Sequence, residues 1–224
     1  MKKGVILLLS SIALSVMYSC NQEANSVYSC SKAINEWVVE NLSVIKTMNR
    51  ADWNQLDEEK KVAVYRAFSF QQRVVFWDEK FKEVMSLNWS EDELQHIEKA
   101  HDFLKDHLSF LSSRELTDDE SDELHRFCYL WVKEGMEKLG WAEKVPLSII
   151  ATGNSIENMD GEIVMMSPLP LVDGPSEKPN CNCHAGNIIF HMCGQNSSCD
   201  DSGCDGASNG CGFFWEESCD GRCY

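Results

Sequence analysis

The chain has few basic residues, because 20 lysines and arginines stand against 36 aspartates and glutamates and give a formal net charge of −16. Removal of Lys2 and Lys3 with the export signal described below makes the charge two units more negative, −18. Such an acidic surface repels phosphate backbones and anionic head groups. We therefore expect no nucleic-acid partner and no attraction to anionic lipid surfaces.

Common catalytic motifs are also missing. The sequence has no His-Glu-x-x-His, no Gly-x-Ser-x-Gly and no glycine-rich phosphate loop. Its histidines show no metal-ligand or triad spacing, and His101 falls on an apolar helical stripe, where a lone histidine is usually a hydrogen-bonded core residue. We predict no catalytic residue, no metal site, no cofactor and no enzyme activity.

Proline is absent before Pro146, and residues 31–141 show helical periodicity throughout. Capping signals predict helix starts at Asn49, Ser69, Ser90 and Thr117, with an irregularity near Asp57. Gly140 is expected to end the last helix. These residues form the predicted helical domain.

The five prolines all lie in residues 142–180, where the helical period is lost. We expect an irregular linker with two short strands, Leu147 to Ala151 and Glu162 to Met166, joined by a turn at Asn158 to Gly161. The predicted fold class is mainly α: a helical N-terminal domain plus a small disulfide-rich C-terminal module with little regular structure.

The N-terminus is typical of an export signal. Two lysines precede an apolar run from Val5 to Val16 that is too short to span a bilayer comfortably. The run ends at Met17-Tyr18-Ser19-Cys20, which resembles the lipobox of a bacterial lipoprotein. We predict a signal peptide at 1–19, lipidation of Cys20 and a tether at 20–30; the alternative is ordinary cleavage with Cys20 as a spare thiol. The protein would then be exported to the outer membrane or cell surface and attached to the membrane through the lipid.

The C-terminal module, residues 181–224, contains most of the cysteines. A segment this short buries too little apolar surface to offset its chain entropy, so covalent links must hold it. Zinc-type Cys-x2-Cys pairs are missing, and in an exported chain disulfides are favoured. Four disulfides are expected, with the pairing left open. The cysteines are Cys181, Cys183, Cys193, Cys199, Cys204, Cys211, Cys219 and Cys223.

Cys30 and Cys128 remain once Cys20 and the tail cysteines are set aside. They form a disulfide with each other, which would close a long loop, or Cys128 is a buried thiol on the apolar face of its helix. The pattern does not choose between these alternatives.

Three adjacent aromatics, Phe213, Phe214 and Trp215, stand in the tail. They cannot all point inward in so small a module, so they are candidates for an exposed patch that docks a lipid, a sugar or a protein. The alternative is that they form a small core with Ile188 to Phe190.

The tail and the helical part together resemble the bacteriocin fulvocin C-related proteins, a family with an eight-cysteine peptide. The likeness in the tail rests on Asn180-Cys181-Asn182-Cys183, Gly210-Cys211-Gly212-x-x-Trp215 and Cys219-Asp220-Gly221 before Tyr224. In the helical part it rests on Ala63 to Phe68 and Phe76 to Lys80, which look like the precursor region of Bacteroidota lipoproteins given this label.

The resemblance implies antibacterial activity of a displayed or released C-terminal peptide, with a target-cell receptor or an immunity protein as its partner. The alternative function is a non-toxic surface lipoprotein whose cysteine-rich module docks a glycan or a protein.

Overall fold

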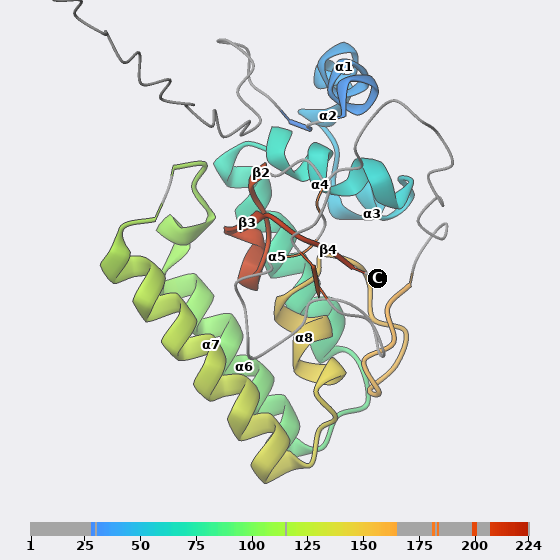
Figure 1. The fold of residues 1–224 in the computed structure, drawn as a ribbon. Coiled ribbons are helices and arrows are strands. Elements are labelled where there is room, and N and C mark those ends of the chain that lie inside the picture. Colours follow the sequence, from blue (N-terminus) through green and yellow to red (C-terminus); the bar gives the residue numbers. More distant parts are fainter. Residues whose placement is uncertain are drawn as a thin grey trace, which may run out of the picture.

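The computed structural model describes residues 28–29, 31–114, 116–164, 181, 183, 199–200 and 207–223. Within these ranges the protein is mainly helical, and its C-terminal region has little regular structure and two disulfides, so the predicted fold class is confirmed (Figure 1). The helices are α1 (Lys32–Glu40), α2 (Leu42–Ile45), α3 (Arg50–Asn54), α4 (Glu58–Ala67), α5 (Phe70–Met85), α6 (Glu91–Asp106), the 3-10 helix η1 (Leu108–Leu111), α7 (Asp118–Leu139) and α8 (Lys144–Ile150).

The helix starts follow the local sequence. Capping boxes form at Asn49, Ser69, Ser90 and Thr117. In each, the side chain of the capping residue accepts a hydrogen bond from the amide three positions later, and the side chain of that later residue accepts one from the amide of the capping residue. α3 ends before Asp57 and α4 begins after it. The chain leaves α7 through Gly140, whose φ of 72° is the left-handed conformation that suits glycine. These predictions are confirmed.

The prediction that helix is absent from residues 142–180 is wrong. Residues 144–150 form α8, so Leu147 to Ala151 is not a strand. Pro146 stands in the first turn of this helix, where its missing N–H would have no intrahelical acceptor. The turn after α8 does form, since the amide of Gly161 donates to the carbonyl of Asn158 at 3.2 Å. Residues 165–180 lie outside the described ranges.

The described residues of the tail form four short strands and one 3-10 helix: β1 (Cys199–Asp200), β2 (Ala207–Cys211), η2 (Phe213–Trp215), β3 (Glu217–Cys219) and β4 (Arg222–Cys223). β1 pairs with β4, with Cys199 opposite Cys223, and β2 pairs with β3, both antiparallel. We call residues 207–219, which comprise β2, η2 and β3, the C-terminal hairpin.

One hydrophobic core includes residues of both predicted parts. It runs from Val38 in α1 to Trp215 in η2 and includes the buried aromatics of α3, α4 and α5. In Figure 1 the hairpin (red) lies beside α5, and α6 and α7 form a long antiparallel pair. The predicted boundary at residue 181 is therefore not a boundary of packing for residues 213–215. In the described part of the chain, no helix is both long and apolar enough to cross a bilayer.

Candidate functional site

The C-terminal hairpin is a tight unit closed by a disulfide. Cys211 and Cys219 are bonded, with their Cα atoms 5.2 Å apart. Gly212 begins the turn with a φ of 70°, and the side chain of Glu217 lies against its Cα, where a Cβ would clash. Glycine is required here on both counts, because side chains disfavour this φ and the space is already filled.

The aromatic residues at the tip of the hairpin are buried. Phe213, Phe214 and Trp215 are 2%, 0% and 6% exposed. The predicted exposed docking patch is therefore wrong. These side chains are accommodated in the core of the helical part, whereas the sequence argument considered only partners within the small tail.

We call the set of residues that surrounds this tip the aromatic cradle; its rings are Trp53, Tyr65, Phe76, Trp77 and Phe81, from α3, α4 and α5. Trp215 has its ring centroid 4.9 Å from that of Tyr65 and 5.5 Å from that of Trp53. Its indole N–H donates to the carbonyl of Ala151 at 3.2 Å. Edge-to-face packing of this kind adds to simple burial.

Phe214 fills the space beside α5, with its ring centroid 5.3 Å from Trp77 and 6.3 Å from Phe81. Its carbonyl accepts a hydrogen bond from the hydroxyl of Tyr65 at 3.5 Å, and that hydroxyl accepts from the indole N–H of Trp77 at 2.9 Å. The Phe214 carbonyl, the Tyr65 hydroxyl and the Trp77 indole thus have partners inside the core, as burial requires.

The backbone at the tip is strained. Phe214 and Trp215 have φ values of 53° and 62°, in the left-handed region that residues with a Cβ rarely adopt. This conformation costs about 1 to 2 kcal/mol per residue. It persists because the cradle fixes both rings, in line with the general finding that such strain is held by the surrounding structure.

Arg73 of α5 lies near enough to Glu216, the residue after η2, to influence its ionisation. The Arg73 guanidinium lies 5.0 Å from the Tyr65 ring centroid and donates to the carbonyl of Arg66 at 3.1 Å. Burial raises the pKa of Glu216 to about 8, although Arg73 acts in the opposite direction. The Glu216 carboxyl is therefore largely protonated at neutral pH.

A contact between His125 and Glu217 joins α7 to the hairpin. His125 Nε2 lies 3.0 Å from Glu217 Oε1, which also accepts the Phe213 amide at 3.2 Å. The hydrogen bond to Glu217 raises the pKa of His125. The Nδ1 of His125 contacts Ser121 Oγ at 3.2 Å. Glu217, His125 and Ser121 thus form a chain of contacts between the hairpin and α7.

Two buried cations hold the loop at residues 151–154, against which Trp215 packs. Neither was expected from the sequence. Arg50, 5% exposed, bonds to Glu83 and donates to the Gly153 carbonyl at 3.0 Å. Lys80, fully buried, donates to the carbonyl of Asn154, and its pKa is well below the usual value because of burial and the nearby Arg50. Lysines and arginines on a helix are ordinarily solvated, so composition gave no signal for these contacts.

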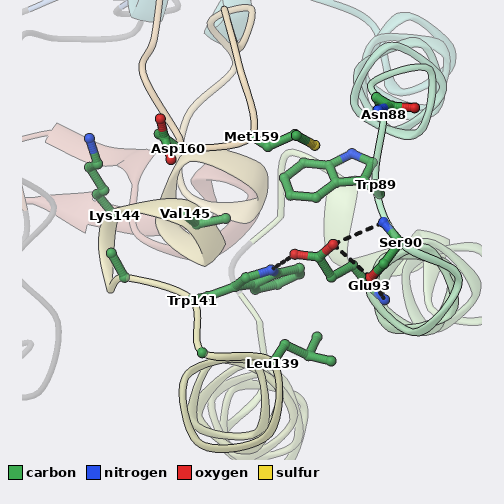
Figure 2. A pocket seen from close by; sticks show the side chains of 12 residues that line it. Asn88, Trp89, Ser90, Glu93, Leu139, Trp141, Lys144, Val145, Met159 and Asp160 are labelled. Carbon is green, nitrogen blue, oxygen red and sulfur yellow. Dashed lines mark hydrogen bonds between the residues drawn. The ribbon is translucent and has the colours of Figure 1, made fainter.

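A cavity of about 760 Å³ lies between the start of α6, the corner from α7 to α8 and the turn at residues 158–161 (Figure 2). The rings of Trp89 and Trp141 line it. The carboxylate of Glu93 already has protein partners: it accepts hydrogen bonds from the Trp141 indole at 2.7 Å and from both the amide and the hydroxyl of Ser90. The Trp89 indole donates to a carbonyl in the last turn of α5. These hydrogen bonds fix the corner between α6, α7 and α8, and they account for the polar groups of Glu93, Trp89 and Trp141 that line the cavity.

The predicted cysteine sites are partly visible. Cys183 is bonded to Cys199, Cys211 to Cys219, and Cys181 is also in a disulfide. Cys128 is a buried free thiol, which is the second of the two alternatives considered for it. Cys20, Cys30, Cys193 and Cys204 lie outside the described residues, and of Cys223 only the backbone is described. The described residues contain no group of His, Cys, Asp and Glu that would hold a metal ion.

No family model, curated protein or solved structure matches this chain.

Proposed function

We propose that the protein is an exported, lipid-anchored carrier of a fulvocin C-like antibacterial peptide, which is its disulfide-rich C-terminal tail. In the intact chain the tail is held by the helical part, and its aromatic tip is covered. Killing then requires that the tail be displayed differently or released, because the covered side chains cannot contact a target.

The observation that carries this proposal is how the tail is attached. Both disulfides whose partners are described, Cys183–Cys199 and Cys211–Cys219, join cysteines within the tail. The one thiol of the helices, Cys128, is free. The described contacts of the tip with the cradle are all noncovalent. This is the construction expected of a folded peptide carried by a holder.

The charge of the tail limits how it would act. Six acidic residues and Arg222 alone give the tail a net charge of −5. Attraction to anionic membranes therefore does not explain killing, and a specific target-cell receptor is required. A dedicated immunity protein would protect the producing cell.

The test is mass spectrometry of the protein made by its native host, with the membrane fraction and the culture supernatant analysed separately. We expect a peptide that begins near Cys181, either in the supernatant or still held in the membrane fraction, and that is about 8 mass units lighter than its reduced form, because four disulfides remove two hydrogens each. This peptide should inhibit the growth of neighbouring strains, and the same peptide after reduction and alkylation should not.

A membrane fraction with only the full-length acylated chain, and no tail fragment in either fraction, would contradict release. Absence of growth inhibition by the intact membrane-bound protein would then contradict display as well. That pair of results would favour the alternative of a non-toxic surface lipoprotein.

A further inference from the structure

We infer that the aromatic cradle is a binding site for the C-terminal hairpin that keeps the hairpin bound after the chain between Val164 and Cys181 is cut. Cleavage alone would then leave the tail bound and its tip covered. As regulation of killing, this presupposes the proposed antibacterial peptide, whereas retention itself does not.

The fit between hairpin and helices carries this inference. Trp215 packs against Trp53, Tyr65 and Phe76, with ring centroids 4.9 to 6.2 Å away. A Cβ added at Gly153 would meet the rings of Phe76 and Trp215, so this glycine lets the loop approach them closely. Surfaces packed this closely resemble the fully desolvated centre of a strong protein interface, where aromatic anchors dominate binding.

Strand β2 of the hairpin also packs closely against the helical part. The Cα of Gly210 in β2 lies against Val62 and Arg66 of α4, where an added Cβ would clash with both side chains. Arg66 Nη2 also lies 3.6 Å from the Sγ of Cys219, at the disulfide that closes the hairpin. The helical part therefore contacts the body of the hairpin as well as its tip.

Directional contacts fix the orientation of the hairpin. The Trp215 indole donates to Ala151, the Tyr65 hydroxyl donates to Phe214, and His125 pairs with Glu217. These bonds connect the hairpin to the residue that follows α8, to α4 and to α7, so it is held from several directions. Cutting a distant linker breaks none of these contacts, so the buried aromatic anchors and the directional bonds should still hold the hairpin.

Separation would leave both parts with uncovered apolar surface. The hairpin would expose three adjacent aromatic side chains, and the cradle would expose the rings that now cover them. Each aromatic side chain buries about 150 to 250 Å². Both parts are therefore more stable together than apart, and a separated tail would need another partner for its tip.

The experiment uses the full chain as its host makes it, with residues 172–178 replaced by the recognition sequence of a site-specific protease. After complete cutting, a denaturing gel without reductant shows whether the two pieces are covalently separate. Size-exclusion chromatography under native, oxidising conditions then shows whether they migrate together. We expect two separate bands on the gel and a single co-eluting complex on the column.

Phe214→Ala in the same cut protein should weaken retention by at least about 100-fold, because truncation of a buried Phe removes its packing energy. The matched control is Phe70→Ala, a phenylalanine of α5 that is 46% exposed and should leave retention unchanged. Should Phe214→Ala prevent folding, the uncut and cut wild-type proteins still decide the matter by elution alone.

Elution of the cut tail as a separate species would overturn the inference, as would pieces that stay joined on the non-reducing gel, since retention would then be covalent. A tail that is retained but proves inert against bacteria after isolation would contradict the proposed antibacterial function and support the binding site. A tail that elutes freely and kills bacteria would support the antibacterial function and contradict the binding site.

Discussion

Phe214 combines a fully buried ring with a left-handed backbone, and the two features affect substitutions in opposite ways. Loss of the ring should destabilise the protein by about 3 to 5 kcal/mol in Phe214→Ala. In Phe214→Gly the ring is lost too, but glycine adopts a φ of 53° without strain. We therefore expect Phe214→Gly to be more stable than Phe214→Ala by about 1 kcal/mol, the reverse of the usual order.

Urea denaturation followed by tryptophan fluorescence would measure this difference. Phe70→Ala and Phe70→Gly, at an exposed helical position, provide the control pair and should show the usual preference for alanine. If alanine were favoured at position 214 as well, the left-handed conformation would not be the native one.

Burial of Glu216 should make the stability of the folded protein depend on pH. Its pKa is raised to about 8 by burial, while an unfolded glutamate titrates near 4.5, so the folded state binds more protons between these values. The stability of the wild type therefore falls as the pH rises through this window. Glu216→Gln, which carries no charge, should match the wild type near pH 4 and exceed it by up to about 5 kcal/mol above pH 8.

Chemical denaturation of both proteins across this range is the measurement. Glu59→Gln, at an exposed position of α4, is the control and should follow the wild-type curve. Parallel curves for Glu216→Gln and the wild type would show that Glu216 is ionised and solvated in the folded protein.

His125 makes a smaller contribution, which also weakens with rising pH. The bond to Glu217 raises its pKa, so its stabilisation is fully present below the unfolded value of about 6.5 and is lost as the pH rises through the folded value. The side chain is 44% exposed, which limits the effect to below about 1 kcal/mol. We expect His125→Gln to lose stability relative to the wild type at about pH 5.5 and to approach it at about pH 8.5.

Denaturation midpoints at these two pH values test the contact. The same comparison in a Glu217→Gln background should show little effect of His125→Gln, since the partner is absent. A pH-independent loss would indicate that His125 contributes only by packing beside Phe213.

At the scale of elements, Gly140 and Gly212 both have a positive φ, but they differ in ψ and in the space around them. Their φ values are 72° and 70°, whereas ψ is 19° at Gly140, in the left-handed helical region, and −165° at Gly212, in a region that only glycine adopts readily. A Cβ at Gly140 would meet nothing within 4 Å, whereas at Gly212 it would overlap the side chain of Glu217. We expect Gly140→Ala to cost about 1 kcal/mol and Gly212→Ala at least about 2 kcal/mol more.

Thermal or chemical denaturation of both variants gives the difference directly. The double variant Gly212→Ala with Glu217→Ala should recover part of the loss, because it removes the overlapping side chain while keeping the strained φ. Equal costs at the two glycines would contradict both the close contact with Glu217 and the glycine-only conformation at Gly212.

The elements that the sequence predicted well are those determined by neighbouring residues. The capping boxes at Ser90 and Thr117 depend on a residue three positions away, and both form. The prediction at Pro146 failed because the position of a proline relative to the helix start decides whether it breaks the helix. Glu143, which precedes α8, makes no side-chain capping bond that would mark that start. The turn before Gly161 was predictable from local sequence.

The burial of the tip was not predictable in the same way. Phe214 contacts Tyr65, 149 positions earlier, and the buried Arg50 and Lys80 are satisfied by carbonyls of Gly153 and Asn154. No local pattern encodes such contacts, because they depend on how the helices pack. The aromatic triplet was a signal that these residues need partners, but the sequence did not say where the partners lie.

For the whole molecule, the shared core implies that the helices and the C-terminal hairpin unfold together. Reduction tests this, because Cys211–Cys219 belongs to the hairpin while the thiol of α7 is free. Loss of a link that closes so short a loop costs about 2 to 3 kcal/mol in the chain-entropy model. We expect reductant to lower the midpoint of thermal unfolding, read from the helical circular dichroism signal, by at least about 5 °C.

Cys128→Ala is the control for this experiment, since it removes the buried thiol and should leave the shift caused by reductant intact. The alternative is a tail that folds by itself, as the sequence suggested. In that case reduction would change only signals from the tail, and the helical transition would keep its midpoint. A helical transition that moves with the disulfides requires that the hairpin stabilise the helices through the cradle, because the helices described have no disulfide of their own to lose.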